Sequence, residues 1–518
     1  MSDMPMNKVV LDGVSLTLDQ IVDVARKMVR VEIADAAIQA INKSRELLEE
    51  LAREGRIIYG VTTGFGALSN TRIDLDQQTE LQKNLIRSHA CGIGEALSTE
   101  VVRAIMLLRL STLAKGFSGV RFSVVLMIQN FLNHGIHPII PSKGSVGASG
   151  DLAPLSHMAL ALMGESDVEF HGQIRHASDV LHELGMSPVI LTMKEGLALN
   201  NGTQMSTAVA ALVLYDAVCL LKVADIATAI SVEALNGFTQ PFDSQIHDAR
   251  PYVGQIDSAY NIRTILSGSG LVRDNVGNGH AQDAYSLRCA PQVLGASREA
   301  LTFAKRLIEI EINSATDNPL VFPDSRRVLS GGNFHGQVVG LAMDTTSLAL
   351  TITSNLSERR VFRLLDSKLN NGLPAFLVGS TQSPGLSSGL MAVQYTAAAL
   401  ASENKVIVHP ATADTIPTSA DQEDFVSMSP SAALKAKRIL ENTMHVIAIE
   451  LLSATQALEF RDRTKCGQGT QAAYVKIRET VPKVTEDRPL ADDINSIDRL
   501  ISDNSILQAV ESRIGTLR

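Results

Sequence analysis

The chain of 518 residues is long enough for two or three domains with large hydrophobic cores. Hydrophobic residues make up 45% of it and charged residues 19%, proportions that fit a folded globular protein and exclude a disordered one. The net charge is −9, and Lys and Arg are scattered without a basic stripe, so neither nucleic acid nor a membrane is an expected partner.

Cysteine usage and the N-terminus bear on the compartment. The four cysteines lie far apart without a C-x-x-C pair, so the sequence predicts free thiols in a reducing cytoplasm, with neither a zinc site nor disulfides. Residues 1–13 lack the charged-then-apolar order of a signal peptide. The most apolar stretch, 205–235, is interrupted by two aspartates and a lysine, which favours a buried helix over a membrane span. The cysteines are Cys91, Cys219, Cys289 and Cys466.

Two styles of pattern follow one another along the chain. Up to residue 198, short helical patterns are separated by glycine-rich turns. From residue 199, long helical patterns rich in Ala and Leu take over. These long helices are predicted at 205–235, 287–312, 336–366, 389–407 and 430–460. We therefore expect a mainly α protein, with a smaller α+β domain at 1–198 followed by an elongated helical bundle at 199–518, and no doubly wound sheet.

The glycine-rich segment 144–157, GSVGASGDLAPLSH, carries the strongest chemical signal. Taken alone, it is typical of a loop in which Ser149 caps a helix. A serine hydrolase turn, G-x-S-x-G, fails by one position, because Asp151 stands where the second glycine belongs. A third interpretation is cyclisation: the Gly150 nitrogen closes a five-membered ring on the Ala148 carbonyl, and loss of water removes the Ser149 hydroxyl. Glycine suits this reaction because it is the least hindered backbone nucleophile.

This segment resembles the signature of the histidine, phenylalanine and tyrosine ammonia-lyase family, and further matches run from about Tyr59 to Ser427. The resemblance implies a 4-methylidene-imidazole-5-one group formed from Ala148, Ser149 and Gly150, with no external organic cofactor, and the sequence indicates no metal-binding residues. Such a group meets a chemical need, because ammonia is a poor leaving group and the β-proton of an amino acid is weakly acidic. An electrophile that bonds to the substrate divides this reaction into easier steps.

Three other segments match the same family. Tyr59 opens YGVTTGFG, a loop by its glycines, and the resemblance makes it the base that removes the β-proton. Asn201, in LNNGTQ, matches an asparagine near the prosthetic group, whose amide can bind the ring oxygen or the substrate carboxylate. Phe334, in GGNFHG, matches an aromatic residue that packs near the ring. Without the resemblance to the family, Tyr59 would be interpreted as the anchor of a surface loop and Asn201-Gly202 as a turn.

A fourth segment, HAQDAYSLRCAPQ, contains Gln282, Tyr285 and Arg288 at spacings of i, i+3 and i+6. On a helix this spacing places the three side chains on one face. A solvated polar face is the alternative, but it explains poorly an arginine next to Leu287 and Cys289. A guanidinium can bind a carboxylate through two hydrogen bonds, and by resemblance Arg288 holds the substrate carboxylate, with Tyr285 and Gln282 beside it.

Two positions bear on the substrate. Ser88-His89 matches a pair that histidine-specific members carry, although some tyrosine-specific members carry it too. Glu423, in SADQEDFVSM, falls where histidine enzymes have Glu and many arylalanine enzymes have Gln. A carboxylate can accept an imidazole N–H, whereas beside a phenyl ring it would be buried without a partner. Three departures from the family pattern are expected to line or flank the pocket: Asn200, Asp421 and Phe425.

The resemblance implies elimination of ammonia from L-histidine, giving trans-urocanate. Alternatives within the family are a tyrosine or phenylalanine lyase, or an aminomutase that returns ammonia to the β-carbon. From other classes, a serine hydrolase using Ser149 and an inactive helical scaffold stay open. The apolar positions of the long helices spread widely around their circumference, which favours lateral association. By resemblance the assembly is a homotetramer whose active sites are shared between subunits.

Overall fold

The structure, a computed structural model, describes residues 8–274, 282–379 and 385–518. It divides into two compact units, which we call unit 1 and unit 2. Unit 1 consists of Met1–Tyr215, Lys305–Asp344 and Pro410–Leu434, and unit 2 consists of Asp216–Ala304, Thr345–His409 and Lys435–Arg518. The predicted boundary between residues 198 and 199 stays a prediction. Each compact unit is made of three segments that lie apart in the sequence, so the units do not correspond to two consecutive halves of the chain.

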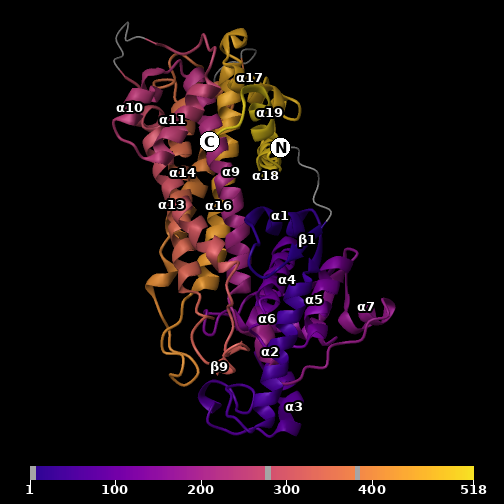
Figure 1. Ribbon diagram of the computed structural model, residues 1–518. Helices are drawn as coiled ribbons and strands as arrows, with labels where there is room; N and C mark the ends of the chain where they lie inside the picture. Colours follow the sequence, from indigo (N-terminus) through magenta and orange to yellow (C-terminus); the bar gives the residue numbers. More distant parts are fainter. Residues whose placement is uncertain (1–7, 275–281, 380–384) are drawn as a thin grey trace. The chain divides into compact units, whose positions relative to one another are not determined.

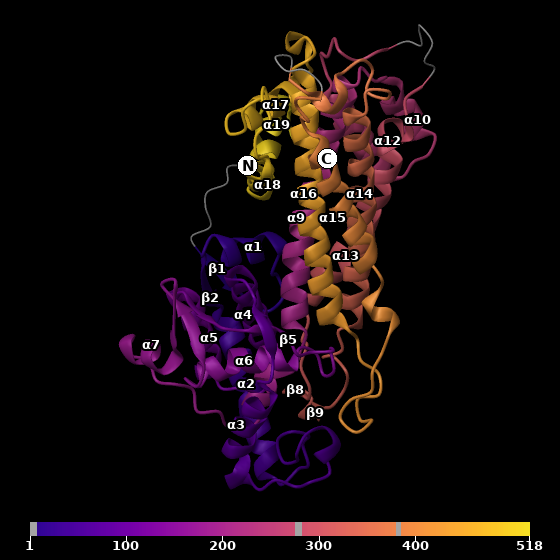
Figure 2. The same ribbon diagram turned by 180° about the vertical axis from the view of Figure 1, so that it is seen from behind.

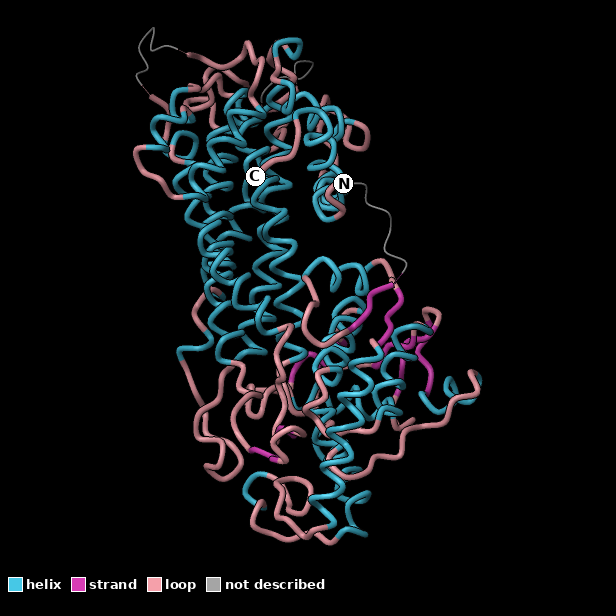
Figure 3. Tube along the Cα trace, in the orientation of Figure 1, coloured by secondary structure: helices cyan, strands magenta, loops and turns pink. Residues whose placement is uncertain are grey.

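Helices dominate the described residues, and the short strands belong to unit 1, as Figure 3 shows. The prediction of a mainly α protein is confirmed. The helices run for up to 31 residues, whereas the strands are only three or four residues long. The helices of unit 1 are α1 (Leu18–Arg26), α2 (Asp35–Arg53), α3 (Gln78–His89), α4 (Thr99–Ala114), α5 (Phe122–His134), α6 (Leu152–Leu162), α7 (Ala177–Glu183) and α8 (Glu195–Asn200).

Helix α4 forms the centre of unit 1. Every residue from Val101 to Ala114 is buried, so this helix is surrounded on all sides rather than amphipathic. It packs against α1, α2 and α5. Two arginines of α4, Arg103 and Arg109, are among the largest fully buried side chains of the described residues, and their charged groups require buried partners.

The strands form small sheets, parallel only between β1 and β2. The pairs β3–β5 and β8–β9 and the three-stranded order β4-β6-β7 are antiparallel. Pairing of β3 with β5 brings the chain after α3 beside the segment 144–150, since a Cβ on Gly144 would lie 2.9 Å from Gly92 Cα. The strands are β1 (Lys8–Leu11), β2 (Arg30–Ile33), β3 (Ile93–Ala96), β4 (Ile136–Pro138), β5 (Pro141–Lys143), β6 (Asp167–Phe170), β7 (Gln173–His176), β8 (Leu320–Phe322) and β9 (Arg327–Leu329).

The five long helices begin and end within three residues of the predicted positions. They are α9 (Gln204–Ala234), α13 (Ala290–Glu311), α14 (Gln337–Leu365), α15 (Met391–Ile407) and α16 (Ser429–Leu458). By length and composition α9 alone among the described helices could cross a membrane, but 72% of its most apolar window is buried inside the protein. It is a core helix here, as its interrupting charges predict.

In unit 2, α13, α14 and α16 run side by side in both views (Figures 1 and 2). A buried carboxylate ties this bundle together: Glu450 accepts hydrogen bonds from Arg360 at 2.5 and 2.7 Å, and from Ser231 and Ser357 at 2.7 Å. The bundle is therefore joined by side chains as well as by apolar packing. The shorter helices of unit 2 are α10 (Ser244–Asp248), α11 (Val253–Ile265), α12 (Tyr285–Arg288), α17 (Gln468–Arg478), α18 (Ala491–Ser502) and α19 (Ser505–Ile514).

Candidate active site

The turn that contains Ala148 departs from ordinary backbone geometry at three positions. Gly147, Ser149 and Gly150 have φ values of 77°, 53° and 79°. Residues with a side chain seldom adopt a positive φ, and strain of this kind is of order 1–3 kcal/mol. Ser145 closes the turn from within, because its Oγ donates to Gly150 O at 3.2 Å and accepts from the Gly147 N–H at 3.1 Å. The segment is a tight, hydrogen-bonded turn.

A close backbone contact requires glycine at the end of this turn. Gly150 forms a parallel bridge with Gly202, and a Cβ on Gly150 would lie 2.2 Å from Gly202 O. The same oxygen accepts the backbone N–H of Asp151 at 2.7 Å. The Asp151 carboxylate accepts the N–H and the hydroxyl of Ser206 at 2.8 and 2.7 Å. Burial raises the pKa of Asp151 to about 6, against the opposing effect of the Ser206 hydrogen bonds.

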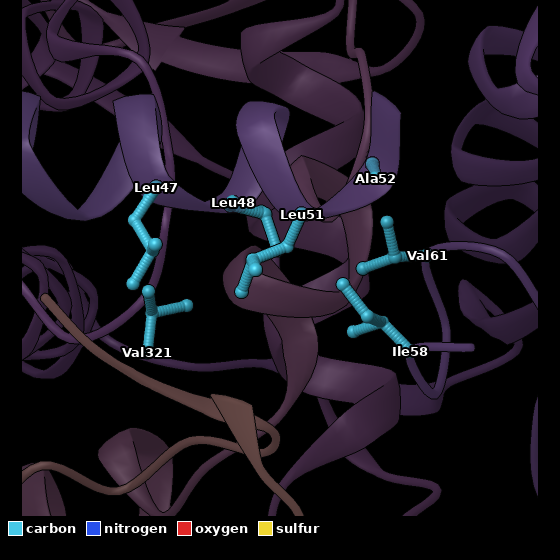
Figure 4. Close-up of a cluster of buried hydrophobic side chains, with 7 residues drawn as sticks. All are labelled: Leu47, Leu48, Leu51, Ala52, Ile58, Val61 and Val321. Atoms are coloured by element: carbon cyan, nitrogen blue, oxygen red, sulfur yellow. The ribbon is translucent and has the colours of Figure 1, made fainter. Parts of the chain in front are cut away.

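The loop that begins at Tyr59 is anchored on both sides of that residue. Ile58 and Val61 are 5% and 0% exposed and belong to an apolar cluster built on α2 and β8, which Figure 4 shows. The Tyr59 hydroxyl accepts the Gly66 N–H at 3.0 Å, and its ring meets Phe65 edge-on with centroids 6.3 Å apart. The cluster consists of Leu47, Leu48, Leu51, Ala52, Ile58, Val61 and Val321.

Two buried glutamines of α3, which sequence reasoning missed, hold the same loop. Gln78 Nε2 donates to Val61 O at 2.6 Å, and Gln82 Nε2 donates to Gly60 O at 3.1 Å. Gln82 Oε1 accepts the Leu197 N–H at 3.1 Å, so this side chain joins the loop to α8. Their spacing of four residues was the available signal, but such polar pairs lie equally well on a solvated helix face.

A cavity of about 610 Å³ in unit 1 collects five residues that the sequence predicts for the site. They are Tyr59, His89, Ser149, Asn201 and Glu423. Apolar side chains complete much of the wall, and a volume of this size is typical of a site for a small molecule. The other polar side chains that line it are Asn84, Ser88, Asn200, Ser419 and Thr71.

His89 and Glu423 determine the electrostatics of the cavity. His89 Nδ1 lies 2.9 Å from Leu85 O, and because a carbonyl only accepts, Nδ1 carries the proton and the neutral ring keeps Nε2 as an acceptor. Burial lowers the pKa of His89, while the Leu85 carbonyl and the Glu423 carboxylate oppose this shift. Glu423 accepts the Ser149 hydroxyl at 3.1 Å and the Thr418 hydroxyl at 2.8 Å. Ser149 thus donates to a carboxylate and not to a histidine, contrary to a serine hydrolase.

Two neighbouring amides border the cavity with unused acceptors. Asn200 Nδ2 donates to Ser156 Oγ at 3.1 Å, and this hydroxyl donates to Leu152 O at 2.7 Å, which ties α8 to α6. Among the described residues, neither Oδ1 of Asn200 nor Oδ1 of Asn201 meets a hydrogen-bond donor. A buried acceptor in this state costs roughly 1–3 kcal/mol. These oxygens can therefore serve a molecule or group bound in the cavity.

Other predicted residues of unit 1 lie away from the cavity wall. Phe334 is half-buried and does not line the cavity. Asp421 and Phe425 are exposed and do not line it either, so only Asn200 among the three departures reaches the wall. The Phe425 ring stacks on His335, with centroids 6.1 Å apart and an interplanar angle of 22°. In the described part of the chain, no three His, Cys, Asp or Glu side chains gather as metal ligands would.

Gln282, Tyr285 and Arg288 belong to unit 2, and their local structure corrects one expectation. Helix α12 is a single turn, Tyr285–Arg288, and Gln282 precedes it, so the three residues do not share a helix. Tyr285 and Arg288 do share a face, because the guanidinium carbon lies 4.7 Å from the centroid of the Tyr285 ring. The segment is too short to sustain the periodicity that its spacing suggests.

Comparison with known proteins agrees with this geometry. A family model described as "Aromatic amino acid lyase" matches residues 16–479. A histidine ammonia-lyase of Alkaliphilus oremlandii is 47% identical over 509 residues, which are 98% of this chain and 99% of that protein. A solved tyrosine aminomutase from Streptomyces globisporus has a TM-score of 0.94 at 40% identity, covering 99% of this chain and 100% of that chain. A solved histidine ammonia-lyase from Trypanosoma cruzi has a TM-score of 0.90 at 40% identity, covering 98% and 96%. The chain therefore belongs to the aromatic amino acid lyase family.

Proposed function

We propose that the chain eliminates ammonia from L-histidine to give trans-urocanate. The observation that carries this proposal is a single cavity lined by Glu423, His89, Tyr59 and Ser149. A carboxylate beside a neutral imidazole offers acceptors to an imidazole N–H, whereas a phenyl ring would donate a hydrogen bond to neither of them. The relatives named histidine ammonia-lyase, similar over nearly the whole chain, support the same substrate.

We further propose that Ala148-Ser149-Gly150 cyclises to 4-methylidene-imidazole-5-one and that no external organic cofactor is used. The residues fit this group in two respects. Ser149 already has a positive φ, and Gly150 meets Gly202 so closely that any side chain would clash. When formed, the group supplies an electrophile to which the substrate can bond.

The other residues of the cavity bind the substrate and move its proton. Tyr59, anchored between two buried residues, takes the β-proton of the substrate. Glu423 accepts the imidazole N–H, once Ser149 has lost the hydroxyl that Glu423 now binds. His89 contributes a neutral acceptor, and the Asn201 amide binds the ring oxygen of the group or the substrate carboxylate.

We propose that the protein works as a cytoplasmic homotetramer with shared active sites, without nucleic acid or membrane partners. In this arrangement Arg288 binds the substrate carboxylate, Tyr285 and Gln282 lie beside it, and Phe334 packs near the prosthetic group. Exposed apolar side chains on the long helices support lateral association. These include Phe303, Ile310, Val338, Leu341, Leu348, Ile352 and Tyr395.

Subunit mixing tests the shared site. Tyr59→Phe and Arg288→Ala chains, each nearly inactive, are unfolded and refolded together in equal amounts, and mixed tetramers are verified by mass spectrometry. We expect activity well above either parent, because some sites then contain both wild-type residues. Tyr59→Phe mixed with Ser149→Ala is the matched control and should not recover, since both residues line one cavity of the same chain. Mixed tetramers of the first pair without recovery would contradict sharing between these two residues.

The second candidate function is that of a tyrosine lyase or aminomutase, favoured by the tyrosine aminomutase structure of TM-score 0.94. A substrate test separates the two. The purified protein is incubated with histidine, tyrosine or phenylalanine, and the ultraviolet absorbance of the conjugated product is followed while chromatography detects β-amino acids. We expect rapid formation of urocanate only. A higher kcat/KM for tyrosine, or a β-amino acid as the main product, would overturn the assignment to histidine.

A further inference from the structure

We propose that Arg109 of α4 is a positioning residue for cyclisation, because it fixes the backbone against which the Ala148-Ser149-Gly150 turn is pressed. The inference rests on the proposed function, since it concerns formation of the prosthetic group. Arg109 is 0% exposed and does not line the cavity, so it touches neither the substrate nor the reacting atoms.

The guanidinium of Arg109 holds the end of α8 and the start of α9. Its Nη1 donates to Ala198 O at 2.7 Å, and its Nη2 donates to Asn201 O at 2.8 Å and to Gln204 Oε1. Gln204 Nε2 in turn donates to Thr316 Oγ1 at 2.6 Å. A planar guanidinium fixes the directions of its hydrogen bonds, so both ends of the 198–204 segment are held in one geometry.

The segment held by Arg109 is the one that meets the turn. A Cβ on Gly202 would lie 2.4 Å from Arg109 Nη2 and 2.2 Å from Thr316 O, so the backbone there has no room to move away. On its other side, Gly202 O accepts the Asp151 N–H at 2.7 Å and lies against Gly150. Ring closure requires the Gly150 nitrogen to approach the Ala148 carbonyl, and a fixed Gly202 prevents the turn from relaxing in the opposite direction.

Charge accounts for the choice of a buried arginine. Burial lowers the pKa of Arg109 to about 10, so it stays protonated at neutral pH, and the carboxylates of Asp317 and Asp151 favour the cation. Lys194 forms a fully buried pair with Asp317 at 2.9 Å. The two cations and two carboxylates balance one another in charge. Arg109 can therefore stay charged inside the protein and donate strong, charge-assisted hydrogen bonds to backbone carbonyls.

The same helix offers a matched control. Arg103 is 1% exposed, and burial lowers its pKa to about 10, as for Arg109. Its hydrogen bonds go elsewhere: Nε donates to Val24 O at 2.8 Å, and Nη1 donates to Leu132 O at 3.0 Å. A lysine at either position leaves the same kind of unsatisfied buried carbonyl, but only Arg109 contacts the segment beside the turn.

The experiment compares full-length wild type, Arg109→Lys and Arg103→Lys made by cell-free synthesis. Folded protein is isolated at intervals, and intact mass gives the fraction of chains that have lost two water molecules. We expect both variants to be less stable in thermal unfolding, while Arg109→Lys alone cyclises about tenfold more slowly, a change in barrier of ~1.4 kcal/mol. Cyclisation of folded Arg109→Lys at the wild-type rate would overturn the inference.

Three further outcomes are decisive. If Arg109→Lys does not fold, Gln204→Leu replaces it, because this change removes one partner of the guanidinium and keeps the arginine; slower cyclisation supports the inference and an unchanged rate overturns it. A wild-type chain of unaltered mass would overturn both proposals. A cyclised wild type with normally cyclised variants would overturn only the role of Arg109.

Discussion

Unit 1 and unit 2 both contain buried arginines, but Arg109 and Arg360 bind different kinds of partner. In unit 1, Arg109 donates to backbone carbonyls of an irregular segment. In unit 2, Arg360 donates to the Glu450 carboxylate, which also binds serines of two neighbouring helices. Regular helices satisfy their own backbone groups and need side-chain links only between them, whereas a turn with positive φ angles needs external partners for its backbone.

Residues with a side chain and a positive φ occur in both units, as Phe376 and Leu377 of unit 2 show, and the turn around Ser149 is the instance in the candidate site. Gly147, Ser149 and Gly150, all in unit 1, have positive φ angles within four residues of the chain. A strained conformation persists only when its surroundings over-determine it. We therefore expect substitution of Ser149 to change the chemistry, whereas substitution of Arg360 should change the stability.

Ser149→Ala should have the largest effect. Alanine has no β-leaving group, so no methylidene forms, and turnover should fall by roughly a thousandfold or more, given that enzymes accelerate reactions by at least ~10⁶-fold. Circular dichroism should match wild type, while intact mass should lack the loss of two waters. Ser142→Ala, in β5 of the same unit, is the control and should cyclise and turn over normally. Substantial activity in a well-folded Ser149→Ala protein would refute the proposed chemistry.

Arg360→Met should act on stability alone. It leaves Glu450 buried without its cation, and breaking a buried pair in this way costs about 3–5 kcal/mol. The double variant Arg360→Met/Glu450→Leu should recover most of this loss, because no uncompensated charge remains. Urea unfolding measures both effects. The prediction is contradicted if folded Arg360→Met protein has an unchanged unfolding free energy but a lower cyclised fraction, because Arg360 would then act on cyclisation as Arg109 is proposed to do.

Glu423→Gln should alter specificity more than turnover. The neutral amide no longer stabilises a cationic ring, and it tolerates a phenyl ring better than a carboxylate does. The ratio of kcat/KM for histidine to that for phenylalanine should fall by about 10- to 100-fold, within the range of a lost polar contact. Asp421→Asn, two residues away and outside the cavity wall, should leave the ratio unchanged. The same ratio in both variants would show that Glu423 does not bind the substrate ring.

Asp151→Asn should change the pH dependence of stability. The pKa of Asp151 is raised from 3.8 to about 6 in the folded protein, so the carboxyl stabilises the fold below pH 4 and loses that contribution as the pH rises through 6. Between pH 4 and pH 7 the unfolding free energy of wild type should therefore fall by ~1–3 kcal/mol relative to the variant. Urea titrations at each pH measure the difference, and parallel curves would contradict the shifted pKa.

Local pattern explains what could be predicted from the sequence. The long helices follow from local composition and spacing, which can be read without knowing the contacts of the fold, and their ends agree within three residues. One cavity is lined by Tyr59, His89, Ser149, Asn201 and Glu423. The sequence could group these residues in advance because each belongs to a motif of the family, whereas a single residue does not indicate its neighbours in space.

The features that could not be predicted from the sequence depend mostly on contacts between residues that are far apart in the chain. Arg109 and Gln82 look like ordinary helix residues, since the partners of Arg109 lie 89 to 95 residues away and Gln82 binds Leu197, 115 residues away. The helix expected to carry Gln282 is too short to include it. Asn200 was noted only as a departure from a pattern, and its bond to Ser156 emerges once α6 and α8 are packed together.

The apolar cluster that contains Ile58 and Val61 holds Tyr59 in place, whereas the outer part of the same loop lies outside this cluster. Lifting Tyr59 from the cavity would expose Ile58 and Val61, at roughly 1.5–3 kcal/mol for each side chain. Beyond Gly66 the same loop carries mostly exposed residues, among them Leu68 at 68% exposure. We therefore expect the outer half of the loop to move more readily than Tyr59, so that its displacement by an entering molecule would leave the proposed base in place.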